Sequence, residues 1–415
     1  MTRIRIIILM ALASALLISC SQTKDVPEDG RANNVNAIEN AAELPATAVK
    51  TTDTPDVAKS TESAGETPEA AESPEPAPET PEAAESPEPA PETPDVAAAD
   101  EHRIDSFEPL SDAQNEKLAA MTWDVDPEIL NAVEKAYEGG HFPFTDELHL
   151  DLFEKHIAGL GGTYIGVGTD QGYLFVGWQR PTLGLMIDYD PWVVIIHKFY
   201  MSFWKICDDA ACLHSYFDDE KKGLEWIKSE AGIAEGLNKA LPVEVYKKTH
   251  RSIARQLKRL ERAKMKSFMN DPETFAFIKK MIEIGRIRTL QANLLGDKAF
   301  ASIASTLNEL GAKVTTLYLS NAEQYWGYSA QFKQNIIGLP AHDNAIILRT
   351  SATKPANNDY RYSIQPIHVF KAWLQHPDGK SVRAVTKRVR VKTPEDFPFV
   401  IDDFMPPEIK SGGNK

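Results

Sequence analysis

Cysteine is scarce in this chain of 415 residues, with three in all. Two of them are Cys207 and Cys212, and no histidines cluster beside them, so these thiols supply too few ligands for a metal site. The sequence also lacks a Walker loop and any Ser/His/Asp group with a recognisable local motif. We therefore expect neither a bound metal nor a function that depends on those motifs.

The N-terminal apolar run, Ile6–Ile18, is too short to span a bilayer, which takes about 20 residues. It follows Arg3 and Arg5 and ends in Leu17-Ile18-Ser19-Cys20, an arrangement typical of a secretory signal. These last four residues resemble a bacterial lipobox, in which the cysteine is lipidated and becomes the first mature residue. The alternative is an ordinary signal peptide, residues 1–20, that happens to contain a cysteine.

Lipidation of Cys20 predicts a stable membrane anchor, because each buried methylene of an acyl chain contributes about 0.8 kcal/mol. In Gram-negative lipoproteins an Asp after this cysteine commonly retains the protein at the inner membrane, and here the residue is Ser21. The resemblance therefore predicts a cell-envelope protein at the outer membrane, on its periplasmic or its surface face. An oxidising envelope also permits a Cys207–Cys212 disulfide. On one helix this five-residue offset separates the side chains by about 140°, so a bond requires a turn at 208–211; two separate buried thiols are the alternative.

Residues 21–100 form a low-complexity segment in which a thirteen-residue unit at 66–78 recurs at 79–91. Proline and carboxylates abound and aromatics are few, so the segment cannot bury enough apolar surface to fold. We expect a disordered tether that spans roughly 50 Å as a coil and roughly 250 Å when extended. A tail that binds a partner is the alternative. Residues 21–100 carry 19 acidic and 4 basic residues, and Arg3 and Arg5 add two positive charges, so the total of −15 leaves −2 for 101–415.

Residues 101–415 show the pattern of an α/β domain, in which short apolar runs alternate with amphipathic segments. We expect a doubly wound, mostly parallel sheet of the Rossmann-like type. A helical insertion interrupts the alternation at about 207–285. The predicted strands are 163–168, 183–188, 288–293, 313–319, 345–349 and an extended stretch at 382–391; the predicted helices are 112–120, 126–137, 171–180, 191–206, 296–310, 331–337 and 367–375.

Glycines punctuate the first strand-to-helix turn, at Gly166, Gly168 and Gly172. Glycine lets the backbone approach a ligand closely, and Asp188 follows the second strand where a nucleotide-binding fold places its ribose-binding acid. Asp190 is an alternative to Asp188. A tight turn that needs glycine for its own geometry explains the pattern equally well.

Two segments, Gly166-Val-Gly-Thr-Asp-Gln and Tyr318-Leu-Ser-Asn-Ala-Glu-Gln-Tyr, resemble the signatures of a poorly characterised bacterial family. The core of that family is similar to class I S-adenosylmethionine-dependent methyltransferases, over roughly 140–380. The resemblance implies that Gly166 and Gly168 border a cofactor's methionine moiety and that Asp188 holds its ribose. Asp170 and Gly172 are further candidate ligand-binding residues. The sequence departs from the methyltransferase motif at Tyr164, where an acid is usual, and in the displacement of the third glycine to Gly172.

The segment 320–326 follows a predicted strand, where parallel sheets form their ligand crevice. Asn321 and Tyr325 are candidate binding residues, and Glu323 is the candidate general base if it is desolvated. A helix start, capped by Ser320 or Asn321, is the alternative.

Lys247–Lys266 holds ten basic residues, counting His250. Contact with phosphates or anionic lipid is one interpretation, and a solvated helix face is the other. We interpret His149 and His156 as structural or exposed, and Trp192, Phe199, Phe203 and Trp204 as core. Nucleic acid is not an expected partner.

Three functional hypotheses follow from location and fold together. S-adenosylmethionine is made in the cytoplasm, so an exported protein would meet little of it. The leading hypothesis is a tethered envelope protein whose methyltransferase-like domain binds another ligand or a partner. The alternatives are an active methyltransferase and a different enzyme in the same crevice.

Overall fold

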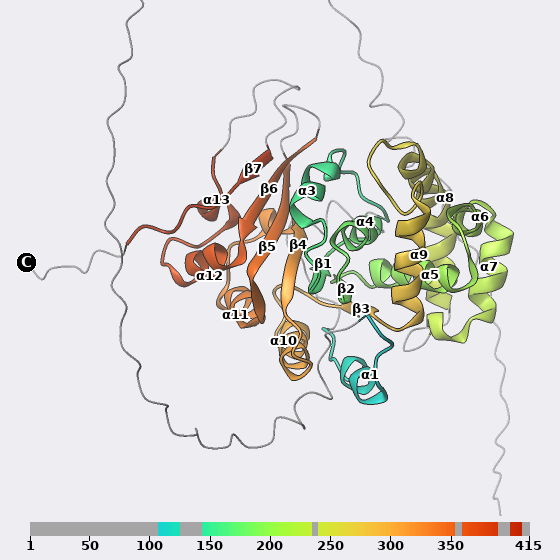
Figure 1. The fold of residues 1–415 in the computed structure, drawn as a ribbon, viewed down its shortest axis with the longest axis horizontal. Helices are drawn as coiled ribbons and strands as arrows, with labels where there is room; N and C mark the ends of the chain where they lie inside the picture. The colour runs from blue at the N-terminus through green and yellow to red at the C-terminus, as the bar shows by residue number, and fades with distance from the viewer. Residues whose placement is uncertain (1–106, 125–142, 235–239, 353–358, 389–398, 409–415) are drawn as a thin grey trace, which may run out of the picture. The chain divides into compact units, whose positions relative to one another are not determined.

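A seven-stranded sheet runs through the computed structural model, which describes residues 107–124, 143–234, 240–352, 359–388 and 399–408 (Figure 1). The strand order is β3-β2-β1-β4-β5-β6-β7. The strands are β1 (Thr163–Gly166), β2 (Leu183–Asp188), β3 (Ile287–Gln291), β4 (Val314–Ser320), β5 (Ala341–Ala352), β6 (Tyr360–Pro366) and β7 (Phe399–Ile401). The predicted signal, tether and 126–137 helix lie outside the described residues.

The first five strands are parallel, β6 is antiparallel to β5, and β7 is parallel to β6. This confirms the predicted α/β fold with a mostly parallel sheet. From β1 the chain builds outward to β2 and β3 on one side, and β4 and β5 follow on the other. The loop after β1 therefore lies at the topological switch point, where such sheets usually bind ligands.

Two hydrophobic cores cover the two faces of the sheet. Alternate strand residues supply them, so that Tyr164 and Met186 belong to one core, and Ile165 and Leu185 to the other. Helices α3 (Glu154–Ile157), α4 (Asp170–Gln179), α5 (Pro191–Ile206) and α9 (Pro272–Glu283) contribute to the first core, with η1 (Leu150–Phe153). Helices α1 (Asp112–Ala119), α10 (Ala299–Glu309), α11 (Ala330–Gly338) and α12 (Ile367–Gln375) contribute to the second.

Helices fill the segment between α5 and β3, where an insertion was predicted. They are α6 (Ala210–Asp218), α7 (Glu220–Ser229), η2 (Ala231–Ala234), α8 (Ala240–Arg262) and α9. Figure 1 shows α6, α7 and α8 on the side of the domain away from β6 and β7. Among the described helices, none is long and apolar enough to cross a membrane.

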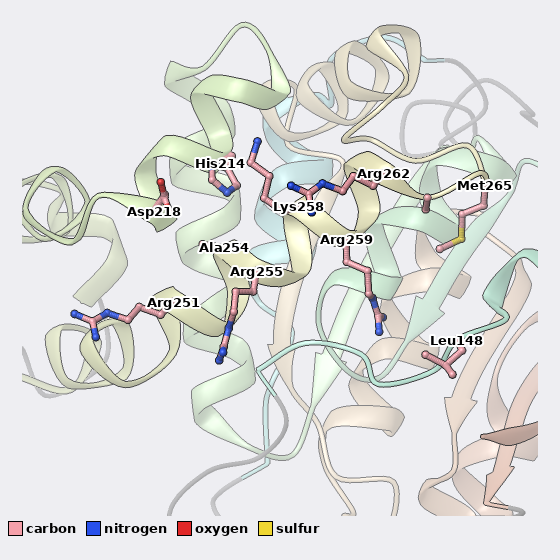
Figure 2. A pocket seen from close by; sticks show the side chains of 11 residues that line it. Leu148, His214, Asp218, Arg251, Ala254, Arg255, Lys258, Arg259, Arg262 and Met265 are labelled. Atoms are coloured by element: carbon pink, nitrogen blue, oxygen red, sulfur yellow. The ribbon is translucent and has the colours of Figure 1, made fainter. Parts of the chain in front are cut away.

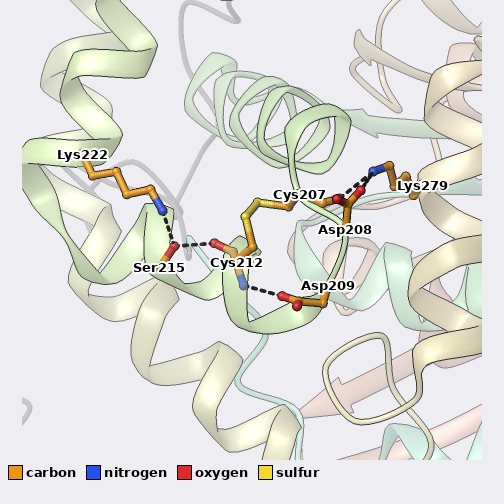
Figure 3. Close-up of a disulfide and its surroundings, with 7 residues drawn as sticks. All are labelled: Cys207, Asp208, Asp209, Cys212, Ser215, Lys222 and Lys279. Carbon is orange, nitrogen blue, oxygen red and sulfur yellow. Dashed lines mark hydrogen bonds and ion pairs between the residues drawn. A yellow bond between two sulfur atoms is a disulfide. The ribbon is translucent and has the colours of Figure 1, made fainter.

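Cys207 and Cys212 form a disulfide, with their Cα atoms 5.4 Å apart (Figure 3). The bond is geometrically possible because α5 ends at Ile206 and α6 begins at Ala210. Asp209 caps α6 by accepting a hydrogen bond from the Cys212 N–H, at 2.7 Å. The required turn at 208–211 is therefore present. Just before it, Phe199, Phe203 and Trp204 are fully buried, as predicted for core residues, and Trp192 is partly buried.

One predicted element was wrong. The stretch at 382–391 was expected to be extended, but the structure begins it with a helical turn, α13 (Val382–Val385), and 389–391 lie outside the described residues. Valine favours strands, yet Val385 is fully buried in the second core, and its packing outweighs this weak local preference.

Candidate functional site

Hydrogen bonds with neighbouring side chains fix the backbone of the glycine loop after β1. Gly168 has a left-handed φ of +84°, and its N–H donates to Asp188 Oδ2 at 3.0 Å. Its carbonyl accepts a hydrogen bond from His197 Nε2 at 2.8 Å, which fixes the neutral His197 tautomer with the proton on Nε2. His197 Nδ1 then accepts from the Tyr173 hydroxyl at 3.0 Å. Both polar groups of the Gly168 backbone are thus satisfied within the protein.

The space beside the three glycines is filled by side chains of the same chain. A Cβ at Gly166 would lie 2.0 Å from the Tyr164 hydroxyl, and one at Gly168 would lie 2.0 Å from Gln171 Nε2. A Cβ at Gly172 would lie 2.8 Å from Met186 Sδ. The glycines therefore make room for Tyr164, Gln171 and Met186, and of the three only Gly168 also has a left-handed φ.

The two predicted carboxylates of this loop are buried and engaged. Asp188 is 4% exposed, and its two oxygens accept the N–H groups of Gly168 and Asp190. Asp170 is fully buried and accepts from the Thr145 N–H at 2.8 Å and from the Gln256 amide at 2.7 Å. Burial raises the pKa of Asp170, and these hydrogen bonds oppose that rise. Asp170 therefore ties the segment before β1 to α8.

These contacts do not fit S-adenosylmethionine. The methionine moiety would need the surface along Gly166 and Gly168, which Tyr164 and Gln171 occupy. Each oxygen of Asp188 accepts one backbone N–H, and this contact by itself does not exclude a ribose, because a carboxylate oxygen can accept a second hydrogen bond. No reaction step is derived through this cofactor.

Glu147 is a buried carboxylate that lies at the carboxyl ends of the strands. It is 3% exposed and accepts hydrogen bonds from four hydroxyls. The donors are Thr145, Tyr318 at 2.5 Å, Ser320 at 2.9 Å and Thr350 at 2.9 Å. Burial raises the pKa of Glu147, and the hydroxyl donors partly offset this.

The segment that carries Glu147 closes this end of the sheet. Glu147 contacts the end of β4 through Tyr318 and Ser320, and the end of β5 through Thr350. The next residue, Leu148, donates its N–H to the Tyr362 hydroxyl of β6 at 3.0 Å. The chain itself therefore occupies the place where a doubly wound sheet usually receives a ligand.

Glu323, the candidate base, is 2% exposed and paired with Arg349, which is 1% exposed. Its other oxygen accepts from the Tyr328 hydroxyl at 2.5 Å. Arg349 also donates to Gln365 Oε1 at 2.8 Å and lies 4.3 Å from the Phe370 ring centroid. Glu323 is buried, which was the condition set for a general base, but its pairing favours a structural role, and the catalytic role of Glu323 stays a prediction.

The other residues of this segment do not converge on Glu323. Tyr325 is 41% exposed, at the end of η3 (Ala322–Tyr325). Asn321 precedes η3 without a side-chain capping bond, and Ser320 has a positive φ of +50°. The segment is not a helix start capped by a side chain, and its polar side chains do not line one common crevice.

The two histidines that we interpreted as structural or exposed both contact other side chains. His149 Nε2 lies 3.7 Å from Asp359 Oδ2, and His156 stacks on Phe399. No group of three potential metal-ligating side chains occurs among the described residues.

An open cavity of about 1030 Å³ lies beside α8, away from the glycine loop (Figure 2). Its walls come from α6, α8, the segment after α8, and Leu148. The lining residues are Leu148, His214, Asp218, Arg251, Ala254, Arg255, Lys258, Arg259, Arg262, Ala263 and Met265. Five of them are basic and belong to the run that was predicted either to contact phosphates or anionic lipid or to be a solvated helix face.

Arg259 links this cavity to the segment that closes the sheet. Its guanidinium donates to the carbonyl oxygens of Thr145 and Glu147, at 3.2 and 3.5 Å. Sequence analysis missed Glu147 and Arg349 because single charged residues in a loop and a strand gave no pattern. It found the basic run but had no signal for the distant residues, His214 and Leu148, that turn a helix face into a cavity.

A family model described as Domain of unknown function (DUF7790) matches residues 142–399. The chain belongs to this family. The matched range contains the closed end of the sheet and the α8 cavity alike. Among curated proteins, no match was found.

Proposed function

We propose that this member of the DUF7790 family is a lipid-anchored envelope protein whose methyltransferase-like domain binds a ligand and does not transfer methyl groups. The observation that carries the proposal is the filled glycine loop. Tyr164 and Gln171 lie where a cofactor would have to approach, and Asp188 is engaged by backbone N–H groups.

The disulfide supports the location. Cys207–Cys212 pairing suits an oxidising compartment, as does the lipobox-like end of the N-terminal signal. A protein beyond the inner membrane would also meet little S-adenosylmethionine, so fold and location favour the same conclusion. A different enzyme in the crevice is less favoured, because Glu147 and Glu323 are both buried and engaged.

Calorimetry with S-adenosylmethionine tests the functional half of the proposal. We expect the purified full chain to give no binding heat at micromolar to millimolar cofactor. Asp188→Asn, which keeps the side-chain shape, should behave identically. Micromolar binding by the wild type that is lost in a folded Asp188→Asn variant would restore the methyltransferase hypothesis.

Fatty-acid labelling in cells tests the anchor. We expect radioactive palmitate to label the protein in the membrane fraction, and Cys20→Ala to abolish the label. The double variant Cys207→Ser/Cys212→Ser is the matched control and should keep it. A full-length, unlabelled, cytosolic protein would contradict the anchor.

A further inference from the structure

Helix α8 has two different faces. One face carries the buried residues Tyr246, Ile253, Leu257 and Leu260, which pack in the first core. The other carries Arg251, Arg255, Lys258, Arg259 and Arg262, whose spacing of three and four residues places their Cα atoms on one side of the helix. This basic face forms part of the cavity wall.

Positive charge at the cavity exceeds what the protein neutralises. Five basic residues and one acid, Asp218, line it, in a domain whose net charge is close to neutral. Arg251 lies 3.8 Å from Glu220, and Lys258 lies 2.8 Å from Glu261.

Arg255 and Arg262 have no acidic partner within ion-pair distance among the described residues. Like charges one helical turn apart destabilise a helix, so a bound anion would relieve repulsion that the chain leaves in place. The helix dipole favours cations only in the last turn, which contains Arg259 and Arg262 but neither Arg251 nor Arg255.

The cavity also has an ordered side and an apolar side. Arg259 is held by the carbonyl oxygens of Thr145 and Glu147, so part of the cationic wall is positioned before any ligand arrives. Figure 2 shows Arg255 and Arg259 extending from the same side of α8, with Leu148 beyond Arg259, whereas the Arg262 side chain extends toward the other side of the helix. Leu148 is 49% exposed, and Met265, Ala254 and Ala263 add further apolar wall.

We propose that the α8 cavity binds a phosphate-bearing amphiphile, with its phosphate on Arg255 and Arg259, its apolar part against Leu148 and Met265, and Arg262 adding positive charge from the other side of α8. This inference rests on the proposed binding function. Guanidinium groups match phosphate oxygens in paired, charge-assisted hydrogen bonds. A volume of about 1030 Å³ suits a lipid headgroup with the start of its chains better than a free phosphate ion. None of the lining residues is Phe, Tyr or Trp, so the cavity has no aromatic platform for nucleic-acid bases.

The test is calorimetry of the full chain with three soluble probes. They are dihexanoyl phosphatidic acid, dihexanoyl phosphatidylcholine with the same chains, and inorganic phosphate. We expect the phosphatidic acid to bind most tightly, with an affinity that falls as salt rises because the charges are screened. Arg255→Gln/Arg262→Gln should weaken it roughly ten- to a hundred-fold, since each charged hydrogen bond contributes about a factor of ten or more.

Two further variants separate the parts of the site. Lys247→Gln removes an exposed charge of α8 that does not line the cavity, and it should leave the affinity unchanged. Leu148→Ser should weaken phosphatidic acid binding about tenfold and leave inorganic phosphate binding as it was. This pair distinguishes a lipid headgroup from free phosphate as the source of the anion.

Several outcomes overturn the inference. They are no phosphatidic acid binding by the folded protein, equal affinity for inorganic phosphate, no effect of the arginine substitutions, or tighter binding of an acidic peptide or single-stranded DNA. Absence of phosphatidic acid binding together with absence of S-adenosylmethionine binding would remove this inference alone. Cofactor binding would remove the proposed function instead.

Discussion

The closed end of the sheet and the α8 cavity are both rich in polar side chains, but they satisfy them differently. Glu147 accepts four hydroxyls, and Glu323 pairs with Arg349 and Tyr328, so the sheet end balances itself. At α8, neither Arg255 nor Arg262 forms an ion pair within 4.0 Å among the described residues, although Lys258 and, more weakly, the charge of Arg262 lower the pKa of Glu261. The position at which this fold usually binds a ligand is therefore filled by side chains of the protein itself. The positive charge that is not paired with acids lies on α8.

This difference shows why a fold alone does not locate a ligand. Buried polar groups are costly unless they are paired, and the buried carboxylates at the sheet end are paired without a ligand, although the Tyr164 hydroxyl beside the glycine loop has no hydrogen-bond partner in the part of the chain that the structure describes. On a surface where cationic side chains repel one another, a bound anion reduces that repulsion and so stabilises the protein. The predictions below test the two regions separately, beginning with the largest expected effect.

Glu323→Ala should destabilise the protein most, by about 3–5 kcal/mol, because it leaves Arg349 charged and buried. The matched control is Glu309→Ala, which removes the partly exposed pair with Lys117 at 2.6 Å and should cost at most about 1 kcal/mol. Urea denaturation followed by circular dichroism measures both. Equal losses would mean that the Glu323 pair does not hold the sheet end together.

Acid should weaken the glycine loop through His197. Burial lowers the pKa of His197 to about 4, from a usual value of 6.5. Because the folded pKa is depressed, the unfolded chain binds a proton first as pH falls from 6.5 to 4, so stability falls across this window by up to about 3 kcal/mol.

A His197→Gln variant should lose that part of the pH dependence. Urea midpoints between pH 7 and 4 give the comparison, with exposed His342→Gln as the control. The buried carboxyls with raised pKa values, Glu147 and Asp170, act in the opposite direction but are shared by all three proteins. Parallel curves for wild type and His197→Gln would argue against a neutral His197 in the folded state.

Loss of the disulfide should affect the inserted helices. Cys207→Ser/Cys212→Ser is expected to lower stability by about 2 kcal/mol, since the closed loop is short. Reductant should lower wild-type stability similarly and leave the variant unchanged. A wild type that is insensitive to reductant after complete reduction would show that the bond does not stabilise the insertion.

The smallest expected effects are those of two glycine-to-alanine substitutions. Their comparison separates the cost of side-chain crowding from the cost of backbone strain. Gly159 and Gly168 both have left-handed φ, of +69° and +84°, but only Gly168 has a side chain against it. Gly159→Ala should cost about 1 kcal/mol, and Gly168→Ala should cost more, because Gln171 must also move. Thermal denaturation checks the order. Equal costs would mean that the loop has free space beside Gly168.

Much of the fold could be predicted because local signals agreed with it. The helix Pro191–Ile206 has the predicted bounds, since Asp190 caps it and Pro191 suits its first turn. Strand β6 was missed because Tyr, Arg, Ser and Gln alternate with few aliphatic residues, yet its positions up to Gln365 are buried. Its burial comes from β5, β7 and the Glu147 segment, which local sequence does not reveal.

The candidate site was harder to predict than the fold. Gly166, Gly168 and Asp188 do meet at the loop, as their spacing indicated, but the spacing could not show that Tyr164 and Gln171 fill it. Glu147 lies about 170 residues from its donors on β4, so its cluster exists only in three dimensions.

The most direct test of the account is parallel calorimetry of the full chain with S-adenosylmethionine and with dihexanoyl phosphatidic acid. The account predicts no heat from the cofactor, and phosphatidic acid binding that Arg255→Gln/Arg262→Gln weakens roughly ten- to a hundred-fold and Lys247→Gln leaves unchanged. Cofactor binding that Asp188→Asn abolishes, with no binding of phosphatidic acid, would contradict it.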